Sequence, residues 1–323
     1  MAKVWAAMSS RNPSGQAFDR LDADFASGSE RCAAWLYLPV GVDSPAVVVM
    51  GHGFAAQRDF RLPAFAEAFA SRGYAVLLFD YRGFGESAGM PRQLVSPRRH
   101  LQDWSAAVDH AANLPQIDRQ RIALWGSSFG GGHALVTAAR RPEVRAVIAQ
   151  VPYVDSLSTL KRLKPGELLQ AAGSGIRDLW RAVTGRDPYT VPVYGRPGEF
   201  ACMNTPESAS GYAALVPPDS AWTNACPARI FLTLPMYRPI ASAARIEVPA
   251  LLLGAEDDEL TPLADVEACA ARIKNARIAR VPGGHFSVYQ GAGFDRAMRI
   301  YLQFLDRGLG TARHGREAAG SAV

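Results

Sequence analysis

A Gly-x-Ser-x-Gly pentapeptide at residues 126–130 constrains this chain more than any other stretch. It follows an apolar run of strand character and precedes a run of small and apolar residues typical of a buried helix. In that context it predicts a nucleophile elbow, a tight strand-to-helix turn that projects the Ser128 hydroxyl above a sheet. Glycine suits positions 126 and 130 because a Cβ there would collide with neighbouring backbone. A glycine-rich turn without chemistry is the alternative, so the rest of the chain must supply a base, an acid and an oxyanion site.

The stretches around this turn alternate between two patterns. Continuous apolar runs, typical of strands buried on both faces, occupy 46–50, 75–79, 122–125, 146–151 and 248–254. Segments with helical spacing occupy 62–72, 100–114, 264–274 and 294–305. A hairpin that turns at Gly28 and Ser29 is expected before them, and a last strand at 276–281. The alternation predicts an α/β protein with a mostly parallel central sheet flanked by helices.

The alternation stops between residues 152 and 245. Proline, glycine and scattered aromatic residues replace it there, and 167–183 is the best helix candidate. So long a structureless loop is unusual in a compact domain, so we expect an inserted cap over a site. The expected division is 1–151 as the first part of the core, 152–245 as the cap insertion, 246–310 as the second part of the core, and 311–323 as a flexible tail.

Composition excludes several classes of function. The net charge of +5 comes without a basic block interleaved with aromatic residues, so we expect no nucleic-acid partner. No run approaches the roughly 18 apolar residues of a membrane helix, and the N-terminus is too short and too weakly apolar for a signal peptide. A cytoplasmic protein without a membrane partner is therefore expected.

The four cysteines, Cys32, Cys202, Cys226 and Cys269, lie far apart and form no metal-binding spacing. Free thiols are expected, although a Cys202–Cys226 bridge stays open because both residues fall in the irregular region. We expect no metal and no cofactor.

The base and the acid are sought after predicted strands. His285 follows the last strand in a Gly-Gly-His-Phe loop, which makes it the candidate base among six histidines. An acidic loop follows the strand at 248–254, and within it Asp258 is favoured over Asp257 and Glu256. The other histidines receive different roles. His133 is expected to be structural, His100 and His110 to lie on a surface helix, His314 in the tail, and His52 to shape a loop.

An oxyanion site needs two donors that point at developing negative charge. One is the backbone N–H of Phe129, at the start of the helix after Ser128, where the helix dipole adds to it. The loop after the strand at 46–50 supplies the second, and the N–H of Phe54 in Gly51-His52-Gly53-Phe54 is the candidate.

Together these motifs resemble the α/β-hydrolase superfamily. They are His-Gly-Phe at 52–54, Asp-x-Arg-Gly-x-Gly-x-Ser at 80–87, the elbow, Asp258 before Thr-Pro, and Gly-His at 284–285. The chain is most similar to the dienelactone-hydrolase-like and X-Pro-dipeptidyl-peptidase-like serine hydrolases. The resemblance implies a triad of Ser128, Asp258 and His285. Dienelactone hydrolase itself uses a cysteine nucleophile, so Ser128 argues against that activity.

The expected function is hydrolysis of a small-molecule ester or thioester through an acyl-enzyme on Ser128. An acyltransferase or polyketide-releasing thioesterase with the same triad is the alternative. A binding protein without catalysis is a remote third, since it predicts a broken triad. The oligomeric state is open, with a homodimer among the alternatives.

Overall fold

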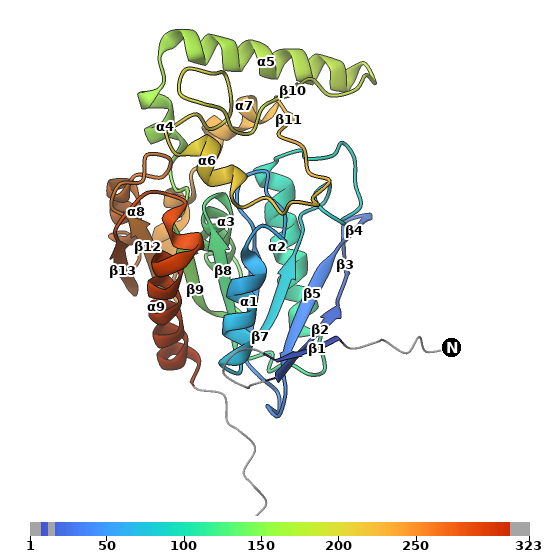
Figure 1. The fold of residues 1–323 in the computed structure, drawn as a ribbon, viewed down its shortest axis with the longest axis vertical. Coiled ribbons are helices and arrows are strands. Elements are labelled where there is room, and N and C mark those ends of the chain that lie inside the picture. Colours follow the sequence, from blue (N-terminus) through green and yellow to red (C-terminus); the bar gives the residue numbers. More distant parts are fainter. Residues whose placement is uncertain (1–7, 12–16, 311–323) are drawn as a thin grey trace, which may run out of the picture.

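The apolar runs of the sequence form one large sheet (Figure 1). The computed structural model describes residues 8–11 and 17–310, so the predicted tail at 311–323 lies outside it. In the described chain nine strands pair in the order β1-β2-β5-β7-β6-β8-β9-β12-β13. Their bounds are β1 Met8–Arg11, β2 Ala17–Asp22, β5 Ala34–Pro39, β6 Val47–Gly51, β7 Ala75–Phe79, β8 Ile122–Ser127, β9 Val144–Gln150, β12 Ala250–Ala255 and β13 Ala276–Val281.

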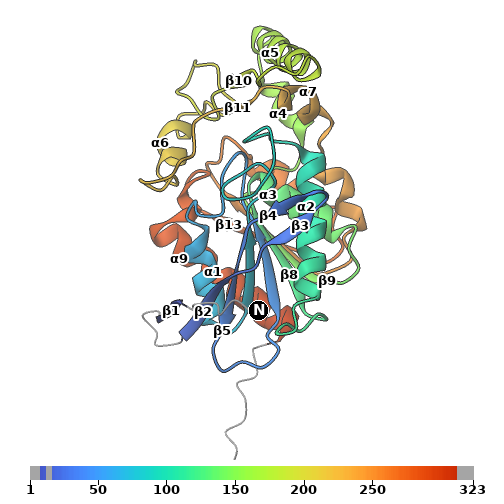
Figure 2. The ribbon, with the colours of Figure 1, turned by 90° about the vertical axis from the view of Figure 1, so that its right-hand side faces the viewer.

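Pairing is antiparallel from β1 to β7 and parallel from β7 to β13. Every residue of β6, β7, β8 and β12 is buried, because helices cover both faces of the parallel part. Figure 2 shows α1 (Leu62–Ser71) and α9 (Gly291–Leu309) on one side of the sheet and α2 (Pro97–Ala112) on the other. The α3 helix (Phe129–Ala138) packs beside α2, and α8 (Leu263–Ala270) packs on β12 and β13. The predicted mostly parallel α/β fold is confirmed.

Two predicted elements differ in detail. The leading hairpin divides into a ladder of β2 with β5 and a smaller one of β3 (Phe25–Ser27) with β4 (Glu30–Cys32), which turns at Gly28 and Ser29 as predicted. The Asp24 carboxylate accepts the Ala34 N–H between the two ladders and interrupts the pairing. The α2 helix begins three residues before the predicted start, because Pro97 suits the first helical position and Ser96 caps it.

Residues 156–245 form an insertion above the carboxyl ends of the parallel strands (Figures 1 and 2). Its helical segments are α4 Ser156–Arg162, α5 Pro165–Val183, α6 Ser208–Ala213, α7 Ile230–Thr233, η1 Leu234–Met236 and η2 Pro239–Arg245. A short ladder of β10 (Thr190–Val191) with β11 (Cys226–Pro227) joins them. The helix predicted at 167–183 is confirmed as α5, and it begins at Pro165. In the described chain, no helix is both long and apolar enough to cross a bilayer.

One buried carboxylate fixes α5 to the rest of the insertion. Asp178 is fully buried, and its Oδ2 accepts hydrogen bonds from the backbone N–H and Nε of Arg229 at 2.9 and 2.6 Å. Its Oδ1 accepts from the Tyr189 N–H at 2.9 Å and from Nη2 of Arg229 at 3.0 Å. Four donors therefore satisfy this charge, which would otherwise be costly to bury.

Asp178→Ala should loosen the insertion, because it leaves Arg229 and two backbone N–H groups without their acceptor. We expect urea unfolding to give a free energy of unfolding about 2–4 kcal/mol lower than that of the wild type, and proteolysis between residues 165 and 229 to be faster. Asp187→Ala, at an exposed position, is the matched control and should change stability by less than ~0.5 kcal/mol. Equal effects of the two substitutions would contradict the anchoring role.

Candidate active site

The turn between β8 and α3 holds Ser128 in a strained conformation. Its φ of 56° and ψ of −120° are a combination that residues with a side chain rarely adopt. The glycines around it are required sterically, since a Cβ on Gly126 would lie 2.1 Å from the Gly130 carbonyl oxygen. One on Gly130 would lie 2.3 Å from the His52 carbonyl oxygen. The Ser128 N–H donates to the Gln150 carbonyl of β9 at 2.8 Å, which fixes the turn against the sheet.

His285 lies in the loop that follows β13, and its imidazole reaches Ser128. Its Nε2 is 3.0 Å from Ser128 Oγ, and its Nδ1 is 2.7 Å from Asp258 Oδ2. The ring is buried, with 2% of the residue exposed. The structure thus brings the three residues predicted as a triad into one continuous chain of hydrogen bonds.

Asp258 follows β12 and is the acid that reaches the histidine. The N–H groups of Leu260 and Thr261 donate to its Oδ1 at 2.9 and 2.7 Å, and the Thr261 hydroxyl lies 2.8 Å from Oδ2. Burial raises the pKa of the Asp258 carboxyl, but His285 and the Thr261 hydrogen bonds together lower it by more. The carboxyl is therefore ionised at neutral pH. The two rejected alternatives, Glu256 and Asp257, are exposed to solvent.

The residues predicted as oxyanion donors, Phe54 and Phe129, lie near one another beside Ser128. Phe129 is the first residue of α3, and its ring centroid lies 5.5 Å from that of Phe54. The loop after β6 passes so close that a Cβ on Gly53 would lie 3.2 Å from the Ser128 Cβ. Backbone of both segments therefore lies close to Ser128.

Residues of the insertion help to line the cavity at Ser128. The cavity there is lined by His52, Phe54, Ser128 and His285 of the core and by Met203, Tyr212 and Leu215 of the insertion, among others. Its volume is about 20 Å³, room for about one water molecule and far less than a small-molecule ester needs. Ser128 itself is partly exposed to solvent, so the space beside it is narrow but open.

Polar contacts also tie the insertion to the loops around Ser128. The Glu207 carboxylate accepts the His285 N–H at 2.9 Å. The Tyr212 hydroxyl donates to the Phe54 carbonyl, and the Trp222 indole donates to the Ala55 carbonyl, each at 2.8 Å. These three residues therefore support the loop that carries His285 and the loop that carries Phe54.

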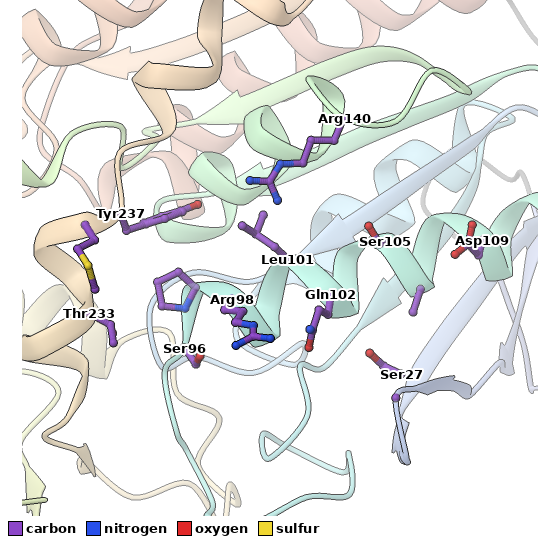
Figure 3. Close-up of a pocket in the computed structure, with 14 residues that line it drawn as sticks. Ser27, Ser96, Arg98, Leu101, Gln102, Ser105, Asp109, Arg140, Thr233 and Tyr237 are labelled. Carbon is purple, nitrogen blue, oxygen red and sulfur yellow. The ribbon is translucent and has the colours of Figure 1, made fainter. Parts of the chain in front are cut away.

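Other hollows lie away from these groups. The largest of those described, about 900 Å³, lies between α2 and residues 233–237, with Arg98 and Arg140 among its lining residues (Figure 3). It includes none of Ser128, Asp258 and His285. In the described part of the chain, no cluster of three or more His, Cys, Asp or Glu side chains is arranged to hold a metal ion.

Comparison with known proteins agrees with this architecture. The model of the family described as serine aminopeptidase, S33 matches residues 43–285. The chain belongs to this family of α/β hydrolases. The quorum-quenching protein AidA of Acinetobacter baumannii is 39% identical to it over 89% of this chain and 94% of AidA.

Two further proteins extend the comparison. Polyketide transferase af380 of Aspergillus fumigatus is 28% identical over 85% of this chain and 93% of its own. The crystal structure of the α/β hydrolase GrgF from Penicillium sp. sh18 superposes with a TM-score of 0.77 at 24% identity, covering 90% of this chain and 99% of GrgF. This last likeness concerns the fold alone.

The 80–87 motif of this S33-family chain contains a buried carboxylate, Asp80, that holds two neighbouring loops. The Asp80 carboxylate accepts the backbone N–H groups of Arg58 and Glu86. A Cβ on Gly85 would lie 2.2 Å from Asp80 Oδ2, so glycine there lets the loop close over the carboxylate. Burial raises the pKa of Asp80 to about 6, despite the opposing effect of Arg58.

Three histidines form a buried cluster beside the elbow. The expectation that His100 lies on the surface was wrong, since only 1% of it is exposed. Its Nδ1 lies 3.2 Å from His133 Nε2, and His133 Nδ1 lies 2.5 Å from the Tyr237 hydroxyl. His52 lies in a loop, as expected; it is also buried, and its Nδ1 faces the Gly53 carbonyl. The sequence pattern predicted α2 as a surface helix and did not show that His100 faces the interior.

Burial lowers the pKa of His52 and of His133 to about 3 and holds the pKa of His100 well below its usual range. A base with a lowered pKa stays neutral until the pH falls below that value. The ring ¹⁵N chemical shifts of these three histidines should therefore not change between pH 8 and pH 5. In urea-unfolded protein all three should titrate near ~6.5. Protonation of any of the three above pH 5 in folded protein would contradict the neutral cluster.

Proposed function

We propose that this chain is a serine hydrolase that cleaves an ester or thioester through an acyl-enzyme on Ser128. The observation that carries the proposal is the hydrogen-bond chain from Ser128 Oγ through His285 to Asp258. A serine hydroxyl is a poor nucleophile until a base accepts its proton, and the base needs a third group to orient it. The 3.0 and 2.7 Å separations are within the range that proton transfer requires.

In the proposed first step, Ser128 Oγ attacks the carbonyl carbon while its proton passes to His285 Nε2. The Asp258 carboxylate holds Nδ1–H and stabilises the imidazolium as it forms. Negative charge on the former carbonyl oxygen is stabilised by the Phe54 and Phe129 N–H groups and by the positive end of α3. The tetrahedral intermediate then collapses, the C–O or C–S bond breaks, and His285 returns the proton to the leaving alcohol or thiol.

In the second step, water attacks the acyl-enzyme and gives a proton to His285. Collapse of this second intermediate releases the carboxylic acid and returns the proton to Ser128 Oγ. We propose that the insertion at 156–245, which the sequence predicted at 152–245, acts as a cap. This role is supported by Met203, Tyr212 and Leu215 above Ser128. A separate cavity of about 570 Å³, lined by Leu160, Leu168, Phe200 and Phe231 among others, lies in the insertion and shares no lining residue with the cavity at Ser128.

Transfer of the acyl group to an alcohol or amine is the second candidate. The narrow cavity at Ser128 supports it, because a bound acceptor that fills this space leaves little room for water. Two relatives are named polyketide transferase af380 and thiohydrolase aneE, so both outcomes are represented by name among similar chains. The partition of a preformed acyl-enzyme between water and an added alcohol separates the two candidates.

A fluorophosphonate probe should add once per chain, at Ser128, because this hydroxyl alone has the His285 base. Peptide mass spectrometry identifies the site, and hydrolysis of a p-nitrophenyl ester should disappear in proportion to labelling. Ser128→Ala should neither label nor turn over substrate, whereas Ser127→Ala, the neighbouring buried serine, should still label. An adduct that persists in folded Ser128→Ala would disprove the assignment.

Asp258→Asn should lower kcat for ester hydrolysis by about 10⁴-fold, because the amide holds the wrong imidazole tautomer. Asp257→Asn, one residue earlier and exposed, should leave kcat within about twofold. Circular dichroism establishes that both variants fold. A comparable loss in both would show that Asp258 has no special role.

A further inference from the structure

The exposed large apolar side chains of this protein concentrate on one helix. Ten such side chains are exposed in the described chain, and five of them belong to α5. They are Leu169, Ile176, Leu179, Trp180 and Val183, with exposed fractions of 75, 60, 46, 50 and 75%. Spacings of 7, 11 and 14 residues from Leu169 place Ile176, Trp180 and Val183 along one face. We call these five residues the α5 stripe.

The two faces of α5 have different surroundings. The inner face packs on α7, where a Cβ on Gly175 would lie 2.8 Å from the Leu232 side chain. On the side of the stripe, a Cβ on Gly173 would have no atom within 4 Å. Figures 1 and 2 both show α5 at the end of the molecule farthest from β1, with its outer side facing no other element. The stripe is therefore not part of the core of the insertion.

Positive charge surrounds the stripe. Between residues 161 and 187 the chain has six Lys or Arg and three Asp or Glu, a net charge of +3. One of the three acids, Asp178, is buried against Arg229 and leaves the outer surface more positive. The Arg186 guanidinium stacks on the Trp180 ring at 4.6 Å, so charge and apolar surface meet at one end of the stripe. Among the described ion pairs, none joins Arg177, Arg181 or Arg186 to a carboxylate.

We propose that the α5 stripe docks this protein on the surface of an anionic lipid bilayer. An amphipathic helix with a tryptophan and aliphatic side chains on one face and flanking Lys and Arg lies in the bilayer interface without crossing it. Anionic headgroups attract the cations while the acyl boundary accepts the apolar side chains. The sequence predicted no membrane partner because it has no long apolar run, but docking in the interface needs none.

A second copy of the chain fits the stripe less well. A helix of 19 residues is about 28 Å long, and a strip about 10 Å wide along it covers on the order of 300 Å². Each partner in a stable protein interface contributes about 800 Å². A bilayer has no such minimum, because binding there scales with buried apolar area and charge. This docking is independent of the proposed reaction at Ser128.

Sedimentation with sucrose-loaded vesicles tests the proposal on the full chain. Vesicles of 70% phosphatidylcholine and 30% phosphatidylglycerol should bind the protein, pure phosphatidylcholine should bind it far less, and salt should weaken binding. Ile176→Ser with Trp180→Ser should lower the partition coefficient roughly tenfold or more. Arg177→Gln with Arg181→Gln should lower binding to anionic vesicles only. Val40→Ser with Met90→Ser removes exposed apolar side chains outside the insertion, is the matched control, and should bind like wild type.

Circular dichroism and hydrolysis of a soluble short-chain ester establish that each variant is folded. Three results would overturn the proposal. They are absence of wild-type binding to anionic vesicles, equal loss in the stripe and control variants, and a wild-type dimer that Ile176→Ser with Trp180→Ser converts to a monomer. The last result would assign the stripe to a second copy. Light scattering after size-exclusion chromatography measures the oligomeric state of the wild type and of this variant.

Discussion

The left-handed backbone at Ser128 is the constraint on which the surrounding structure depends. A serine with φ of 56° is unfavourable in isolation, so its neighbours must hold it there. The parallel pairing of β8 with β6 and β9 supplies that support, because it places the His52 carbonyl against Gly130 and the Gln150 carbonyl against the Ser128 N–H. The register of three strands therefore determines where one hydroxyl lies. A slip in any of them would displace it.

Buried polar groups hold the loops around this hydroxyl, and each has several partners. Asp258 is held by Thr261, whose hydroxyl also lies 3.0 Å from the Val151 carbonyl. Asp80 organises the neighbouring loop in the same way. These carboxylates accept backbone N–H groups that the turns leave without partners, which offsets the cost of burying the charge. The loops are thus positioned by hydrogen bonds from their own backbone as well as by apolar packing.

The sequence predicted the features that local pattern determines. Continuous apolar runs located the parallel strands, and residues just past those strands, Ser128, Asp258 and His285, do meet at one edge of the sheet. Long-range contacts were not predictable in this way. Glu207 contacts the backbone of His285 across 78 positions, and nothing in its neighbourhood indicates that partner. His100 lies on a helix whose pattern does not reveal that the cluster of His52, His133 and Tyr81 occupies the space beneath it.

The contacts of Glu207 and Tyr212 have a thermodynamic consequence. The insertion that helps to line the cavity at Ser128 also holds the His285 N–H and the Phe54 carbonyl. Any displacement of this segment that breaks those two bonds to admit a molecule also leaves the loops on both sides of Ser128 less ordered. Entry of a molecule at Ser128 and the ordering of these two loops are then linked equilibria. Only a molecule whose contacts favour the return of the insertion shifts the population back to the ordered state.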